Sequence, residues 1–272
     1  MEIFTLTVIG GQGKQGQAEP LAGLDLEMGR ILSIVGPTGS GKTALINDIG
    51  LFACRNTPSR RRVLINGAEP PEAFLDDPSK NPIALITQHT SFLSDLPVHR
   101  FLDIHARIRK HARPGTVVEE TLDFANQLTG EPVIVDAAMT ELSGGQSRAL
   151  LIADAVVIGN APIILLDEIE NAGIDRTRAL ELLRRYRKIF IFVTHDPRIA
   201  LLSDSRLIMS AGAMQQQIAT SAEEQGMAER IRVLDELMLE LRERIRAGEH
   251  IAYEALRVHI ERARRALTEE AA

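Results

Sequence analysis

The chain has 272 residues, 44% hydrophobic and 25% charged, which is enough for a well-buried core in one or two domains. A formal net charge of -6 disfavours nucleic acid as a partner. The single cysteine, Cys54, excludes an internal disulfide and favours the cytoplasm. No apolar run is long enough to cross a bilayer, and the N-terminal segment predicts a strand and not a signal peptide. Any membrane-spanning part would therefore belong to another chain.

The N-terminal part of the chain predicts strands around one helix. Apolar segments at residues 2–9 and 30–36 predict strands, with a Gly/Gln-rich turn between them. Residues 42–53 have the helical spacing of apolar positions. Residues 60–67 and 81–87 predict two further strands.

The middle of the chain predicts helices and then buried strands. Residues 96–128 are helical and polar in pattern, split by Pro114-Gly115, and we interpret their basic side chains as a solvated helix face. Residues 161–168 and 188–196 each contain a short, fully apolar strand flanked by helices. This pattern is typical of a buried parallel sheet in an α/β domain.

The segment from residue 222 onward has a different pattern. Apolar residues recur at steps of three and four from Ile231 to Ile245 and again from Tyr253 to Leu267. Gly248, between the two runs, fits a helix stop. We expect two amphipathic helices, most simply a helical hairpin that packs on itself or on the body. The alternative is an appendage for dimerisation or for docking a partner.

The segment GPTGSGKT fits the phosphate-loop pattern G-x-x-x-x-G-K-[ST], between a predicted strand and a predicted helix. Its glycines allow successive backbone N–H groups to point at phosphates. Lys42 would reach the β- and γ-phosphates, and Thr43 would ligate Mg²⁺. The candidate nucleotide ligands are Gly36, Pro37, Thr38, Gly39, Ser40, Gly41, Lys42 and Thr43.

Other candidate catalytic residues follow predicted strands. Two carboxylates end the apolar run IILLDE, where Asp167 would hold Mg²⁺ and Glu168 would polarise the attacking water. His195 follows the apolar run IFIFV and would sense the γ-phosphate. Gln88 ends IALITQ, and its amide would bridge the metal and the attacking water.

A second glycine-rich segment, ELSGGQSR at residues 141–148, opens a predicted helix. With it, the chain resembles an ABC-type ATPase, because the motifs occur in that family's order: the phosphate loop, Gln88, LSGGQ, IILLDE, a D-loop-like segment ending in Asp175, and His195. The LSGGQ signature is the most diagnostic of these. The resemblance extends from the N-terminus to about residue 218.

The resemblance implies a P-loop NTPase fold of ABC type with a mixed β-sheet core. An antiparallel N-terminal β-subdomain and a helical subdomain at about residues 96–160 would complete an ATPase domain spanning residues 1–220. Residues 221–272 would be a C-terminal helical appendage.

The resemblance also implies a split site, with ATP and Mg²⁺ as cofactors. Two cassettes, here a homodimer, would pair head to tail. The signature of one would then cap the nucleotide held by the other, with its helix N-terminus aimed at the γ-phosphate. The signature residues concerned are Ser143, Gly144, Gly145 and Gln146, joined by Asp175.

Two departures from the family pattern stand out. The aromatic residue that usually stacks on adenine near the end of the first strand is missing near Ile9, which leaves Phe4 as an aromatic candidate or an aliphatic or Gln contact instead. The segment IENAGID, residues 169–175, replaces the usual transporter sequence after Glu168. It resembles the Suf iron–sulfur assembly ATPase and the ATP-carrying component of methyl-coenzyme M reductase activation.

Two functions remain after this comparison. The first, slightly favoured, is a soluble ATPase that assembles or activates a metalloprotein partner, on the basis of IENAGID and the helical tail. The second is the energising subunit of a membrane transporter, located in the cytoplasm against a permease, because the span from Gln88 to Ser143 suits a subdomain that receives a permease. A chromosome-maintenance ATPase would need a longer insertion, and a catalytically dead module would lack Lys42 or Glu168.

Overall fold

The computed structural model describes residues 2–87, 89–167 and 176–250, together with residues 257, 260, 261 and 264. The chain divides into two units, Met1–Ala219 and Thr220–Ala272. Within the described residues, no helix combines the length and the apolar character that crossing a bilayer requires.

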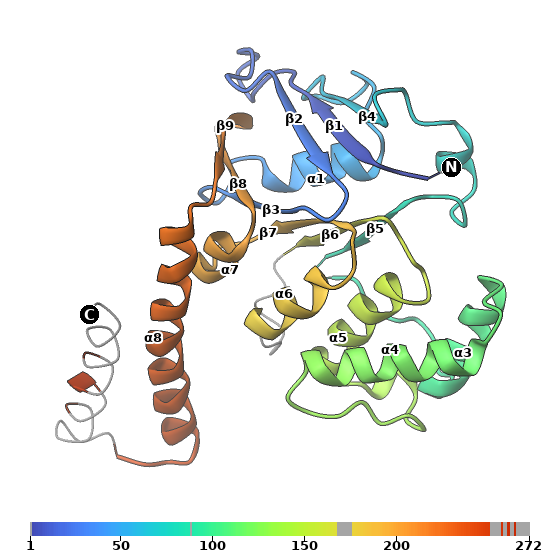
Figure 1. Cartoon of the computed structure of the whole chain (residues 1–272), viewed down its shortest axis with the longest axis vertical. Helices are drawn as coiled ribbons and strands as arrows, with labels where there is room; N and C mark the ends of the chain where they lie inside the picture. Colours follow the sequence, from blue (N-terminus) through green and yellow to red (C-terminus); the bar gives the residue numbers. More distant parts are fainter. Residues whose placement is uncertain are drawn as a thin grey trace. The chain divides into compact units, whose positions relative to one another are not determined.

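The first unit is built on a six-stranded sheet in the order β5-β6-β7-β3-β8-β9 (Figure 1). Its neighbours pair in parallel except for β9, which runs antiparallel to β8. The strands are β3 (Ile31–Val35), β5 (Ile83–Ile86), β6 (Ile163–Asp167), β7 (Ile189–Val193), β8 (Ser205–Ser210) and β9 (Ala213–Ala219). Because β3, β5, β6 and β7 are parallel, their carboxyl ends meet at one edge of the sheet.

A second, antiparallel sheet in the order β2-β1-β4 covers one face of the first unit. Its strands are β1 (Thr5–Ile9), β2 (Gly23–Glu27) and β4 (Arg62–Ile65). Burial alternates along β4, with Val63 and Ile65 inside, as expected for a sheet with one solvated face.

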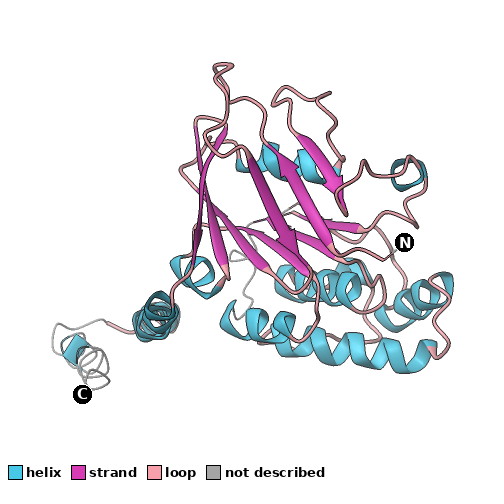
Figure 2. Cartoon of the chain, turned by 45° about the horizontal axis from the view of Figure 1, so that its top comes forward, coloured by secondary structure: helices cyan, strands magenta, loops and turns pink. Residues whose placement is uncertain are grey.

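Helix α1 (Lys42–Gly50) lies between the two sheets, whereas α4, α5 and α6 cover the opposite face of the six-stranded sheet (Figures 1 and 2). The other helices are α2 (Ala73–Asp76), α3 (Val98–Ile108), α4 (Pro114–Leu128), the short 3₁₀ helix η1 (Met139–Glu141), α5 (Gly144–Val156), α6 (Arg176–Arg184) and α7 (Pro197–Leu202).

Each face of the six-stranded sheet has its own hydrophobic core, because successive side chains of a strand point to opposite faces. Leu165 and Ile191 pack with α1 and the antiparallel sheet. Leu166, Phe190 and Phe192 pack with the helices of the other face. This two-sided burial explains why β6 and β7 are apolar at nearly every position.

The mixed sheet and the antiparallel N-terminal sheet agree with the fold expected from the sequence. Pro114 is the first residue of α4, and the break between the helices lies before it, because proline lacks an N–H and suits the first turn of a helix. The hairpin β8–β9 was not predicted. Its signal is the two-residue turn Ala211-Gly212, where both residues have positive φ (50° and 82°), as the tightest hairpins require.

The second unit contains helix α8 (Ala222–Arg246). Ser221 caps its first turn, where Ser221 Oγ accepts a hydrogen bond from Glu224 N at 3.2 Å and Glu224 Oε2 accepts one from Ser221 N at 3.0 Å. The helix ends before Gly248, which adopts a left-handed conformation (φ 75°), so the predicted helix stop is confirmed. The second predicted helix of the hairpin falls mostly outside the described residues.

Candidate nucleotide site

Three of the predicted motifs meet at the carboxyl edge of the parallel strands. The phosphate loop (Gly36–Thr43) follows β3, Asp167 ends β6, and His195 follows β7. In the sheet register Ile34 pairs with Val193, and Val193 pairs with Asp167. Adjacent strands lie about 4.8 Å apart, so the sheet brings these strand ends side by side. Gln88, Glu168 and Asp175 lie outside the described residues.

The phosphate loop turns tightly into α1 at Gly41, the N-cap residue, which has a left-handed conformation (φ 99°, ψ 13°). A Cβ atom at Gly41 would come within 2.8 Å of Gly212 Cα, so only glycine fits here. Gly41 has no side chain to cap α1, which leaves the N–H groups of its first turn available to an anion.

Lys42 is buried within the loop and is held by the loop's own carbonyl groups. Its ammonium donates hydrogen bonds to Gly36 O at 2.8 Å and to Pro37 O at 3.1 Å. Ser40 is also buried, and its Oγ has no hydrogen-bond partner among the described residues. A buried hydroxyl without a partner is costly, so Ser40 fits a loop that is completed by a ligand with acceptor or donor atoms.

The segment around His195 is fixed by its neighbours. Asp196 caps α7 by accepting hydrogen bonds from Arg198 N (2.7 Å) and Ile199 N (3.3 Å), and its own N–H donates to Thr194 Oγ1 at 2.9 Å. His195 itself is exposed. A rigid, capped backbone therefore presents the imidazole at the carboxyl edge of the sheet.

The signature segment forms the N-terminus of α5. Ser143 Oγ accepts from Gln146 N at 3.3 Å, while Gln146 Oε1 accepts from Ser143 N at 3.0 Å. Gln146 Nε2 donates to Pro132 O at 2.7 Å, so the side chain of this buried residue is bonded within its own chain. Ser143 and Gly144 remain exposed. Gln146 therefore stabilises the first turn of α5, while Ser143 and Gly144 are exposed to solvent.

Helix α5 also places a cation near the sheet edge. Burial lowers the pKa of the Arg148 guanidinium, and the negative charge of Asp167 opposes that shift. The signature helix and the carboxylate at the end of β6 are therefore electrostatically linked.

A pocket of about 640 Å³ adjoins the phosphate loop. It is lined by the β1–β2 loop at residues 12–14, the loop at residues 57–61, Gly212, and Gly41 and Ala44 at the start of α1. Lys14 extends over the phosphate loop, where its ammonium donates a 2.7 Å hydrogen bond to Gly39 O. The phosphate loop is thus contacted by a second lysine in addition to Lys42.

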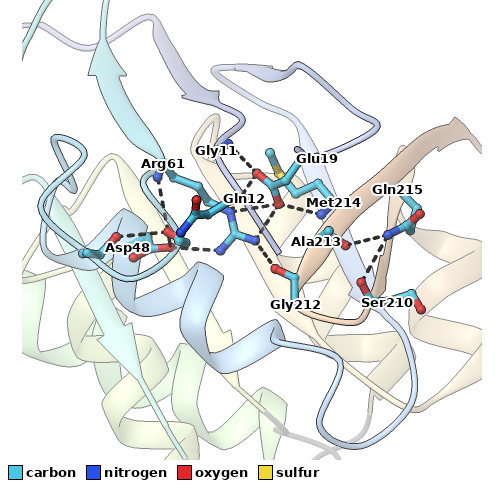
Figure 3. A network of polar contacts seen from close by, with 12 residues as sticks. Gly11, Gln12, Glu19, Asp48, Arg61, Ser210, Gly212, Ala213, Met214 and Gln215 are labelled. Atoms are coloured by element: carbon cyan, nitrogen blue, oxygen red, sulfur yellow. Dashed lines mark hydrogen bonds and ion pairs between the residues drawn. The ribbon is translucent and has the colours of Figure 1, made fainter. Parts of the chain in front are cut away.

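A buried polar network centred on Arg61 forms one wall of this region (Figure 3). Arg61 Nη2 approaches Glu19 Oε1 to 2.7 Å, Arg61 Nη1 approaches Asp48 Oδ2 to 2.9 Å, and Arg61 Nη2 also donates to Gly212 O at 2.8 Å. Glu19 in turn accepts from Gly11 N (2.8 Å) and Met214 N (2.6 Å). The network therefore joins the β1–β2 loop, α1, the segment before β4 and the β8–β9 turn.

Comparison with known proteins identifies the family. Residues 22–171 match the family described as ABC transporter. An uncharacterized ABC transporter ATP-binding protein of Methanocaldococcus jannaschii is 47% identical over 93% of this chain and 97% of its own length. The chain belongs to the ABC transporter family. It is an ABC ATPase, and ATPases of this family bind ATP, generally with Mg²⁺.

More distant relatives are named as ATP-binding proteins of import systems. The spermidine/putrescine import ATP-binding proteins PotA of Bacteroides fragilis and Bacillus thuringiensis are 30% and 32% identical over 71% and 75% of this chain. The chain spans only 41% and 62% of their respective lengths. ATPases of this family dimerise, and in transporters they pair with a membrane permease.

Solved structures show the same fold. Clostridium perfringens cbiO1, part of the ABC transporter complex cbiONQ, has a TM-score of 0.61 at 22% identity, covering 85% of this chain and 95% of its own. An ATP-binding cassette in a dimeric post-hydrolysis state bound to ADP and Pi has a TM-score of 0.60 at 23% identity, covering 80% of this chain and 99% of its own.

The position of Phe4 in this ABC ATPase does not suit an adenine platform. Phe4 precedes β1, whereas the loop that reaches the phosphate loop follows β1. The start of β1, next to Phe4, and its end, where the β1–β2 loop begins, are about 17 Å apart, because each of the five residues advances the strand by about 3.3 Å.

Sequence reasoning missed Lys14, Glu19, Asp48, Arg61 and Gly212. Each is polar or small and lies in or beside a turn or helix, where such residues are common and carry no motif. The one available signal was the Ala-Gly pair before the polar run QQQ, which fits a tight hairpin turn.

Proposed function

We propose that this ABC ATPase is the ATP-hydrolysing subunit of a membrane transporter, working at the cytoplasmic face of the membrane through a permease. The observation that carries the proposal is the 47% identity, across nearly the whole chain, to a protein named as an ABC transporter ATP-binding protein. The import proteins PotA support the same role. The soluble metalloprotein-activation role, slightly favoured by the sequence, rests on the segment 169–175, which lies outside the described residues, and on the helical tail, of which α8 is described. The comparisons favour the transporter.

The phosphate loop is the proposed binding site of ATP. Lys42 neutralises charge on the β- and γ-phosphates, and the N–H groups at the start of α1 bind phosphate oxygens. The pocket beside Lys14 accommodates the nucleoside. Oxygen donors suit Mg²⁺, and the hydroxyl of Thr43 and the carboxylate of Asp167 would hold it together with Gln88. When bound, Mg²⁺ supplies charge neutralisation at the phosphate oxygens.

Hydrolysis is an in-line attack by water on the γ-phosphate, driven by positioning and electrostatics. Glu168 orients the attacking water and accepts its proton, and His195 donates a hydrogen bond to the γ-phosphate. The signature of a second copy, through exposed Ser143 and Gly144 and through Gly145, closes the site with its helix N-terminus. Asp175 lies at the same contact between the two copies. ATP therefore joins the two copies, and its hydrolysis lets them separate.

The region after β5 offers a surface for the permease. Leu93 is 95% exposed and Leu96 40% exposed, and on α3 Ile104 and Ile108 are also exposed. Phe92 and Phe101, which pack edge to face with centroids 5.2 Å apart, support this segment from inside. Clustered exposed apolar side chains mark interaction surfaces.

The test is purification of the Glu168→Gln variant from its native cells in MgATP and mild detergent. We expect a protein with several membrane spans to be retained. Leu93→Asp in the same background should release it, whereas Leu75→Asp, a change at another exposed leucine, should not. Retention of a soluble oxidoreductase or scaffold, with no membrane protein, would restore the assembly role.

A further inference from the structure

The Arg61 network is a buried ion cluster near the phosphate loop, and it has no part in the catalytic roles above. The side chains of Arg61 and Glu19 are completely inaccessible, and that of Asp48 is 6% exposed. Ser59 Oγ also donates to Asp48 Oδ2 at 2.7 Å. Charges survive such burial only when they are paired and hydrogen-bonded, as these are.

Pairing alone does not explain the cluster, because apolar side chains of similar volume are often equally stable or more stable at such positions. Apolar side chains, however, cannot form directional hydrogen bonds that fix the positions of their neighbours. The planar guanidinium of Arg61 fixes three partners at once, in three different segments: Glu19, Asp48 and the carbonyl of Gly212.

Each of these segments leads directly to the phosphate loop. Gly212 N donates to Ser40 O at 2.8 Å, and Lys14 N donates to the neighbouring Ala211 O at 2.9 Å. Asp48 lies on α1, the helix that the phosphate loop opens. Holding the β8–β9 turn therefore also holds the backbone of Lys14, whose ammonium then reaches Gly39 O.

We propose that Arg61 is a positioning residue for nucleotide binding, which acts by fixing the β1–β2 loop and the β8–β9 turn so that Lys14 stands as a second phosphate-binding cation beside the phosphate loop. The proposal rests on the nucleotide site proposed above and is independent of the transport role. Lys14 contacts the nucleotide, and Arg61 contacts only the protein.

The experiment measures the dissociation constants of MgATP and MgADP by calorimetry, well below the unfolding temperature of each variant. Arg61→Met and Lys14→Met should each weaken MgATP binding by about fivefold or more. Because Arg61 acts through Lys14, the double variant should be within about twofold of Arg61→Met. The matched control is Arg62→Met, at the next residue along the chain, which removes an ion pair with Glu69 between side chains that are 35% and 57% exposed and should leave binding unchanged.

A merely structural role would lower the unfolding temperature of Arg61→Met and leave its affinity within about twofold of wild type. That result would overturn the proposal. The proposal would also fail if the factors by which Arg61→Met and Lys14→Met weaken MgATP binding multiply in the double variant. If Arg61→Met does not fold, the triple variant Glu19→Leu, Asp48→Leu and Arg61→Met removes all three charges. Wild-type affinity in the triple variant would equally refute the positioning role.

Lys42→Ala in the same assay separates this inference from the proposed site. If Lys42→Ala loses MgATP binding while Arg61→Met keeps it, only the positioning role fails. If Lys42→Ala binds MgATP normally, the phosphate loop is not the site, and both proposals fail.

Discussion

Arg61 and Glu19 are 42 residues apart in the sequence, yet their charged groups approach to 2.7 Å with both side chains completely buried. The pair joins the loop between two antiparallel strands to the segment preceding a third. A contact of this kind is stabilising only while it is complete, because each charge has given up its hydration.

Arg61→Met should therefore be among the most destabilising single changes in the chain. It leaves Glu19 and Asp48 buried without their cation, and we expect the free energy of unfolding to fall by ~3–5 kcal/mol. Urea denaturation would measure the change. The triple variant with all three charges replaced should recover most of the loss, and an unchanged midpoint for Arg61→Met would show that the network contributes little to stability.

Ser143→Ala should reduce both stability and turnover. The lost N-cap of α5 costs about 1 kcal/mol. ATPase activity should fall by about tenfold or more, because in the proposed split site the hydroxyl contacts the nucleotide of the partner cassette. Ser221→Ala is the matched control, since it removes the equivalent capping box from α8. Equal ATPase activity in the two variants would show that the Ser143 hydroxyl has no role in catalysis.

Glu168→Gln should retain MgATP and form a stable dimer, because in the proposed split site the uncleaved nucleotide stays between the two cassettes. Light scattering at saturating MgATP would detect a doubling of mass. Lys42→Ala, which loses the cation held by Gly36 O and Pro37 O, should remain monomeric in the same buffer. A monomeric Glu168→Gln variant with bound MgATP would contradict the split homodimeric site.

Gly212→Ala should weaken both folding and MgATP binding. The residue has φ 82°, and a Cβ atom would come within 2.7 Å of Lys14 Cγ and 2.8 Å of Lys14 N. We expect a loss of ~1–3 kcal/mol in the free energy of unfolding, together with displacement of Lys14. Gly67→Ala is the control, because Gly67 has a similar φ of 76° but open space around it. It should show only the backbone cost of about 1 kcal/mol and normal binding.

Lys188 should give the fold a measurable pH dependence. Burial lowers the pKa of its ammonium from 10.5 to about 8, although it donates to Asn160 Oδ1 and Ala161 O. Between pH 8 and pH 10.5 the unfolded chain binds more protons than the folded chain, so the free energy of unfolding rises with pH across this window.

The rise attributable to Lys188 is at most ~3–4 kcal/mol, from 1.36 kcal/mol per pKa unit. Urea denaturation at a series of pH values would measure it. Lys188→Met should abolish that rise, while Lys80→Met, at a lysine whose side chain is 61% exposed, should keep it. The same slope in wild type and Lys188→Met would show that Lys188 does not carry the effect.

The sequence by itself determined the features that a few consecutive residues encode. The strand, tight turn and helix around Gly41 follow from backbone conformations available within that segment, and the apolar runs of β6 and β7 indicate burial on both faces. Because parallel strands end at one edge, the strand positions of Asp167 and His195 were enough to place them with the phosphate loop.

Only the tertiary structure decided what surrounds the phosphate loop. Glu19 and Met214 are 195 residues apart but share a 2.6 Å hydrogen bond. Lys14 reaches Gly39 where the β8–β9 turn bonds both to the β1–β2 loop, through Ala211 O, and to the phosphate loop, through Gly212 N. No local propensity encodes such contacts, since they depend on strand order and on which turns it brings together. Phe4 likewise lies at the opposite end of β1 from the β1–β2 loop, and that position is set by the direction of the strand and not by the chemistry of the side chain.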